Sequence, residues 1–141
     1  MGRILSIDYG RKRTGLAVTD PLQLIAGTLG TVPTHELLTW IADYLKREVV
    51  EAIVVGYPLG TDGGISETAR LYVDPFVSSL KKKFPLQQIV LEDERYTSKI
   101  AFQTMVDAGI KKKDRRNKSS LDAISATLIL QSYLSRKGRQ D

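Results

Sequence analysis

The spacing of short apolar segments changes at Pro33, and this change restricts the fold more than any other feature of the chain. Before Pro33 the pattern is typical of β-strands separated by turns that contain Gly, Asp and Pro. The expected strands are residues 3–7, 14–18 and 26–32. Strands joined by such short connections pair as antiparallel neighbours. The chain up to Pro33 therefore predicts a three-stranded antiparallel meander.

After Pro33, apolar residues at helical spacing alternate with short apolar runs. The expected elements are a helix with Thr34 as its N-cap, a strand at 52–55, a helix at 66–83, a strand at 88–91, a helix at 98–107 and a helix from about Ser119. The run at 52–55 is apolar throughout, as in a buried parallel strand. Pro75 lies inside a helix, so a kink or a break is expected there. This order predicts an α/β fold with a mixed five-stranded sheet flanked by helices.

Length and composition limit the class of protein. The 141 residues fit a single domain spanning 1–141, and a 42% hydrophobic content excludes a disordered chain. There is no cysteine, which excludes disulfides, thiolate metal sites and cysteine nucleophiles. No apolar stretch approaches the ~18 residues of a membrane span, and Asp8 interrupts what would be the apolar part of a signal peptide. We expect a cytoplasmic protein.

Positive charge is concentrated near the C-terminus. The net charge is +5, and residues 109–141 alone contain nine basic and three acidic residues. Such a cluster suits a polyanion, above all a nucleic acid, although a solvated loop followed by a frayed tail has the same composition. Aromatic residues are 7% of the chain and scattered, so no platform for stacking single-stranded bases is apparent.

Three acidic residues fall where this element order can bring them together. Asp8 ends the first strand, Glu94 follows the last strand, and Asp122 is expected in the first turn of the last helix. Ligands of α/β proteins favour the carboxyl ends of parallel strands. Carboxylate oxygens suit Mg²⁺ or Mn²⁺, and two such ions about 4 Å apart can stabilise an in-line displacement at a phosphodiester.

Each of these residues also has a structural explanation. Asp8 could bond its own turn, Asp122 could interact with the helix dipole, and Glu94 could pair with a basic neighbour. His35 is expected to be a surface residue rather than a general base. The glycine-rich segment 56–64 lacks the Gly-Lys-Ser/Thr ending of a P-loop, so we interpret it as a rim loop, with phosphate binding as the alternative.

Four motifs resemble those of the YqgF/RuvX family. Residues 8–20, Asp-Tyr-Gly-Arg-Lys-Arg-Thr-Gly-Leu-Ala-Val-Thr-Asp, follow the family pattern Asp-x-Gly-x-x-Arg-x-Gly-x-Ala-x-x-Asp. The further matches are 56–58 with 62–63, 93–98, and Lys118 with 122–126 and 129–131. The matches run in family order over nearly the whole chain.

The resemblance implies a ribonuclease H-like fold and a nuclease that matures the 5′ end of pre-16S ribosomal RNA. It also implies that Asp8, Glu94 and Asp122 are the catalytic acids and hold Mg²⁺ or Mn²⁺. Related nucleases usually have a fourth acid, which cannot be assigned here; strand alternation turns Asp93 to the opposite face from Glu94. Arg13 and Arg95 are candidates for orienting the acids or for binding phosphate.

Precursor rRNA is the expected partner, with branched DNA and the ribosome as further candidates. The residues expected to contact nucleic acid are Arg11, Lys12, Arg13, Arg95, Lys111, Lys112, Lys113, Arg115, Arg116 and Lys118. Three alternatives stay open: a Holliday-junction DNA resolvase, a ribosome-assembly RNA-binding protein without catalysis, and an actin/Hsp70-type ATPase. The last of these needs two such domains around a nucleotide, and 141 residues supply one. The sequence makes no prediction of oligomeric state.

Overall fold

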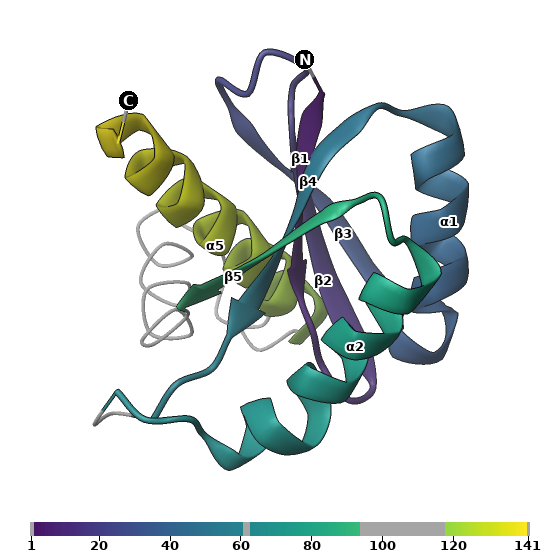
Figure 1. Cartoon of the computed structure of the whole chain (residues 1–141), viewed down its shortest axis with the longest axis vertical. Coiled ribbons are helices and arrows are strands. Elements are labelled where there is room, and N and C mark those ends of the chain that lie inside the picture. The colour runs from purple at the N-terminus through teal and green to yellow at the C-terminus, as the bar shows by residue number, and fades with distance from the viewer. Residues whose placement is uncertain (1, 61–62, 94–117, 141) are drawn as a thin grey trace.

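The computed structural model describes residues 2–60, 63–93 and 118–140, which form one sheet with helices on both faces (Figure 1). The strands are β1 (Arg3–Asp8), β2 (Arg13–Thr19), β3 (Ala26–Pro33), β4 (Val50–Tyr57) and β5 (Gln88–Asp93). Their order across the sheet is β3-β2-β1-β4-β5. β1 pairs with β2, and β2 with β3, in antiparallel orientation, whereas β4 is parallel to both β1 and β5. The predicted meander with two added parallel strands is confirmed.

The helices divide between the two faces of this sheet (Figure 1). Helices α1 (Leu37–Arg47) and α2 (Asp74–Lys83) cover one face, and α5 (Lys118–Gln140) crosses the other. Strand alternation supplies both cores: Leu5 and Ile7 pack under α1 and α2, while Ile4 packs against Ile129 of α5. Among the described residues, no helix is both long enough and apolar enough to cross a bilayer.

A π-helical segment precedes Pro75. In η2 (Ala69–Val73) the chain winds with a wider turn, and the N–H of Asp74 donates to the carbonyl of Ala69, five residues back. Thr68, Val73 and Asp74 all have helical dihedral angles, so the helix continues without a break into α2, and Pro75 stands inside it directly after the wide turn. The irregularity expected at Pro75 is therefore a wide turn just before the proline.

The prediction that Thr34 caps α1 is wrong. Thr34 begins the short 3₁₀ segment η1 (Thr34–Glu36) and makes no side-chain capping bond. Its hydroxyl donates instead to the carbonyl of Gly10 at 2.6 Å and shares a hydrogen bond with the hydroxyl of Thr14 at 2.9 Å. Thr34 thus ties the start of the helical layer to the β1–β2 turn.

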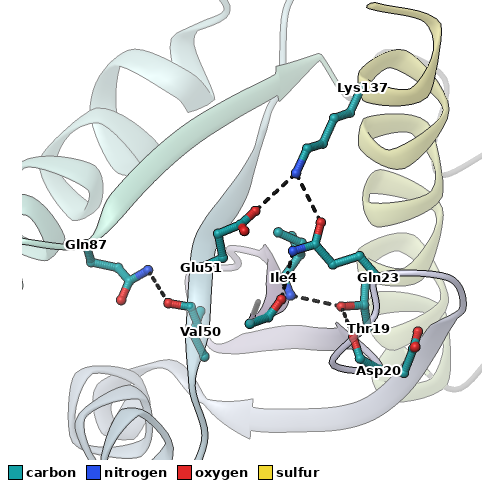
Figure 2. Close-up of polar contacts among 9 residues, drawn as sticks. Ile4, Thr19, Asp20, Gln23, Val50, Glu51, Gln87 and Lys137 are labelled. Carbon is teal, nitrogen blue, oxygen red and sulfur yellow. Dashed lines mark hydrogen bonds and ion pairs between the residues drawn. The ribbon is translucent and has the colours of Figure 1, made fainter. Parts of the chain in front are cut away.

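The C-terminal half of α5 is fixed at the edge of the sheet where β1 and β4 begin. Figure 2 shows the Nζ of Lys137 donating to Gln23 at 3.0 Å and lying 3.1 Å from the carboxylate of Glu51. Hydrogen bonds from Gln23 and Lys137 lower the pKa of Glu51. Arg136 also pairs with Glu92 of β5 at 2.6 Å. These contacts fix the course of α5 across the sheet, and hence where its N-terminal half lies.

Candidate functional site

Asp8 is the last residue of β1 and lies on the face that α5 covers. The two residues before it on that face both contact α5: Ile4 packs in the core cluster of that helix, and Ser6 Oγ donates to the carbonyl of Ala126 at 2.8 Å. Alternation along the strand places Asp8 on the same face. Asp122 lies one helical turn before Ala126, on the same side of α5.

Gly15 brings the two acids together. It is the cross-strand partner of Asp8 in the antiparallel pairing of β1 and β2. A Cβ atom at Gly15 would lie 2.1 Å from the carbonyl oxygen of Asp122 and 2.4 Å from its carbonyl carbon. Only glycine therefore allows the α5 backbone to approach β2 at this level. Asp8 and Asp122, two of the three predicted acids, consequently lie beside the same residue.

Asp122 lies farther along its helix than the sequence predicts. α5 begins at Lys118, so no acidic residue is in its first turn and the expected place of Asp122 there is wrong. The helix dipole acts mainly within the first turn, which weakens the purely structural explanation of this acid. Its Oδ2 lies 3.6 Å from Nε of Arg13, a residue on the same face of β2 as Gly15.

A basic turn borders the two acids. An open hollow of about 560 Å³ is lined by Gly10, Arg11, Lys12, Arg13 and Asp122. Arg11 and Lys12 are exposed, whereas the Nε of Arg13 is buried and has no hydrogen-bond partner within the described part of the chain. Cationic side chains beside carboxylates can hold a phosphate while the carboxylates hold a cation.

The conformation of this turn is fixed by close packing. A Cβ atom at Gly10 would lie 2.1 Å from the carbonyl oxygen of Arg13, so this position also requires glycine. The Gly10 carbonyl accepts the hydrogen bond from Thr34 described above. The basic side chains therefore project from a turn that is anchored to both the sheet and the helical layer.

Two other acids near the motifs are used by the fold. Asp20 accepts backbone N–H groups of Ile25, Leu24 and Leu22, and these bonds lower its pKa. Glu92 is buried against α5, where Ser132 and Arg136 donate to its two oxygens. Both carboxylates are therefore engaged by contacts within the fold.

Several predicted residues lie outside the described part of the chain. These are Glu94, Arg95, Lys111, Lys112, Lys113, Arg115 and Arg116. Lys118 begins α5. β1 and β5 are both parallel to β4, with Ile7 level with Val55 and Val55 level with Leu91, so the strand that leads to Glu94 ends at the edge where Asp8 lies. Within residues 2–60, 63–93 and 118–140, no three His, Asp or Glu side chains are grouped to hold a metal.

The role of Gly15 was not read from the sequence, although a signal was present. A glycine within a strand loses packing and marks a close backbone approach or a bulge. Gly15 stands directly opposite Asp8, so its strand position already pointed to a close neighbour at the candidate site. His35, by contrast, is exposed, as expected.

Comparison with known proteins extends this picture. Residues 2–136 match the family model described as RuvX, Holliday junction resolvase. Proteins of Bacteroides fragilis and Bacteroides thetaiotaomicron, each named "Putative pre-16S rRNA nuclease", are 55% and 56% identical over 137 residues, covering 97% of this chain and 99% of theirs. A protein of the same name from Porphyromonas gingivalis is 52% identical over 139 residues, covering 99% of this chain and 100% of its own.

Among solved structures, the chain is similar to Thermus thermophilus RuvC in complex with a Holliday junction substrate. The TM-score is 0.60 and the identity 16%, covering 98% of this chain and 97% of RuvC. At this identity the likeness concerns the fold, and it confirms the predicted ribonuclease H-like arrangement. With the family match over residues 2–136 and relatives above 50% identity, the chain belongs to the RuvX family.

Proposed function

We propose that this chain, acting as one domain over residues 1–141, is a metal-dependent nuclease that hydrolyses phosphodiester bonds at the 5′ end of pre-16S ribosomal RNA. The observation that carries the proposal is the meeting of Asp8 and Asp122 at Gly15, beside a basic hollow. The family match and the names of relatives that cover nearly the whole chain support the same activity.

Asp8, Asp122 and Glu94 are the proposed ligands of Mg²⁺ or Mn²⁺. Carboxylate oxygens are the hard donors that both ions prefer, so the chemistry of Asp8 and Asp122 fits the group. A divalent cation held there supplies charge stabilisation to the attacking and leaving oxygens of the phosphodiester. The ion pair between Arg13 and Asp122 offsets negative charge at the site and orients this carboxylate.

Arg11 and Lys12 are proposed to hold backbone phosphates on either side of the bond that is cleaved. They are exposed on the fixed β1–β2 turn and line the same hollow as Asp122. Contacts to phosphate position a nucleic acid without reading its sequence. Arg95, Lys111, Lys112, Lys113, Arg115, Arg116 and Lys118 are proposed to extend this basic surface.

Cleavage of a branched DNA is the second candidate function, because the family description names Holliday junction resolution. The relatives at about 55% identity carry the name of an RNA nuclease, so we favour RNA.

The test incubates the purified protein with a 5′ leader of precursor 16S rRNA and with a four-way DNA junction, each in Mg²⁺, Mn²⁺ or EDTA. We expect cleavage of the RNA in either cation and none in EDTA. Cleavage of the junction alone would support the resolvase function. Tight RNA binding without cleavage in either cation would indicate a ribosome-assembly factor that is not an enzyme.

A further inference from the structure

A second hollow lies on the other side of the β1–β2 turn. It measures about 400 Å³ and is walled mainly by aromatic and apolar side chains, among them Tyr9, Leu71, Tyr72, Pro75 and Phe76. The walls come from the residue after β1, from η1 and the start of α1, and from η2 and α2. Binding sites for small organic groups in proteins have volumes of roughly 300–1,000 Å³ and are lined in this way.

Two aromatic contacts give this pocket its geometry. The ring of Tyr9 stacks on Phe76, with centroids 4.6 Å apart and planes inclined by 25°. The guanidinium carbon of Arg11 lies 4.6 Å from the centroid of Tyr72. Phe76 is buried, which fixes Tyr9, whereas Tyr72 is half-buried. The ring of Tyr72 therefore already accepts a planar, charged group that reaches it from the turn.

The aromatic pocket and the hollow beside Asp122 adjoin at Tyr9 and Gly10, which line one hollow each and are consecutive in the chain. Asp8 faces α5, and the adjacent Tyr9 lies on the opposite face and packs with the core under α1 and α2. Arg11 connects the two hollows, because it lines the one beside Asp122 and its guanidinium lies over Tyr72, which lines the other. A polynucleotide that crosses the β1–β2 turn would therefore contact basic side chains at the tip of the turn, carboxylates on one side of it and aromatic rings on the other.

We infer that the aromatic pocket binds an unpaired nucleobase of the RNA, one that lies next to the phosphate held at the acid site. The inference rests on the proposed nuclease function and specifies its substrate as RNA with a single-stranded segment. A base stacks on Tyr72 in place of the Arg11 guanidinium, which moves onto a neighbouring phosphate. Every base has a π-face, so this contact favours unpaired RNA without selecting a sequence. A base within a duplex is already stacked on both faces and does not enter.

Aromatic residues that are scattered in the sequence thus form a stacking site in the fold. Tyr9, Tyr72 and Phe76 come from segments separated by more than sixty residues and meet only because α2 packs against the end of β1.

The test measures RNA binding in EDTA, where no cation-dependent cleavage occurs. The probes are a single-stranded RNA carrying one 2-aminopurine and a fully paired hairpin of the same composition. Tyr72→Leu is compared with Tyr72→Phe, which keeps the ring, and thermal melts check that both variants fold. Since stacking on an aromatic side chain changes affinity by roughly 5- to 150-fold per base, we expect Tyr72→Leu to weaken single-stranded binding by that factor. The affinity for the hairpin and the salt dependence of RNA affinity should stay unchanged. Quenching of 2-aminopurine fluorescence should be retained with Tyr72→Phe and lost with Tyr72→Leu.

Ser79→Leu provides a second variant, because Ser79 is exposed on α2 and lines the pocket, so a larger apolar side chain there narrows the pocket without adding an aromatic ring. It should weaken single-stranded binding like Tyr72→Leu. Single-stranded binding and quenching at wild-type levels in the folded Tyr72→Leu variant and in the folded Ser79→Leu variant would overturn the inference. If these variants lose single-stranded binding while the wild type cleaves no RNA in Mg²⁺, the pocket stands and the nuclease function fails. If the wild type cleaves RNA and the variants bind normally, the nuclease function stands and the inference about the pocket fails.

Discussion

Asp8 and Asp20 begin and end one sequence motif, yet they lie at opposite edges of the sheet in different surroundings. Asp20 follows β2 at the edge where β1 starts, and backbone N–H groups of its own turn donate to both of its oxygens. Asp8 ends β1 opposite Gly15, where the α5 backbone and Asp122 approach. A carboxylate engaged by local backbone donors builds a turn. A carboxylate that lies beside a second carboxylate and a basic hollow is suited to catalysis.

The same contrast holds for the basic residues of the two edges. Where β1 and β4 begin, Arg3 pairs with Glu48 at 3.2 Å and Lys137 with Glu51 at 3.1 Å. At the other edge, Arg11 and Lys12 are exposed around an open hollow. The first edge therefore holds the fold together, and the second presents charge to a ligand.

The largest effect in this comparison is expected from Asp122→Asn. Cleavage should fall by orders of magnitude, because a displaced cation no longer stabilises the reacting oxygens. The stabilisation that Mn²⁺ adds in a thermal melt should shrink, whereas stability without metal should change little. The ion pair with Arg13, half-exposed, is worth about 0–1 kcal/mol, and relief of repulsion between the acids opposes its loss. Cleavage and Mn²⁺ stabilisation at wild-type levels would remove Asp122 from the site.

Gly15→Ala tests whether the close approach of α5 sets the site. The added methyl group would meet the Asp122 carbonyl, so α5 must shift. We expect a loss of about 1–3 kcal/mol in the free energy of unfolding, and a fall in cleavage of roughly 100-fold from the displaced acid. The matched control is Gly27→Ala in β3, where a Cβ would meet only the carbonyl of Val18, at 3.6 Å. Equal effects of the two substitutions on urea unfolding and cleavage would contradict this explanation.

A smaller effect is expected when the basic turn is neutralised. Replacing Arg11 and Lys12 together with Gln should lower RNA affinity for all sequences alike. The slope of log affinity against log salt should decrease by about 0.7 for each single-strand phosphate that the variant no longer neutralises. The control replaces Lys81 and Lys82, which lie exposed at the C-terminal end of α2, with Gln. An unchanged slope in the Arg11 and Lys12 variant would mean that the turn does not bind phosphate.

The smallest effect is expected from Asp20→Asn, and it depends on pH. Hydrogen bonds from the N–H groups of Ile25, Leu24 and Leu22 lower the pKa of Asp20 below its ordinary value of 3.8. A carboxylate with a lowered pKa in the folded state stabilises the protein above its unfolded pKa and loses this contribution as pH falls through the folded pKa. The free energies of unfolding of wild type and Asp20→Asn should therefore differ at pH 7 and converge below about pH 4. A difference that stays constant in urea unfolding at pH 7 and pH 3 would contradict this role.

Much of the fold could be predicted from periodicity alone. The change of pattern at Pro33 separated the meander from the alternating half, and the helix predicted at 66–83 is present as η2 and α2. Asp8 was placed by the same reasoning, because strand ends and alternation are local properties of the chain.

What sequence reasoning missed depends on contacts between distant segments. The hydroxyl of Thr34 could cap the following helix or bond to a distant segment. The structure has the distant hydrogen bond, to the carbonyl of Gly10. The close approach at Gly15 depends on the packing of α5 across the sheet, to which the contacts of Lys137 with Glu51 and Gln23 contribute at its far end. A glycine within a strand signals a close approach, but no local pattern says which segment approaches it or that Thr34 bonds to Gly10.

The most direct measurement of the central claim compares Asp8→Asn with Asp20→Asn. Both variants make the same chemical change within one motif, and cleavage of the pre-16S rRNA 5′ leader in Mg²⁺ is measured beside RNA affinity in EDTA. We predict that Asp8→Asn loses cleavage by orders of magnitude and keeps its RNA affinity, while Asp20→Asn keeps most of both, because an Asn oxygen can still accept the N–H groups of Leu24 and Ile25. Cleavage by Asp8→Asn at the wild-type rate, or an equal loss in the two variants, would contradict the assignment of chemistry to the Asp8 edge.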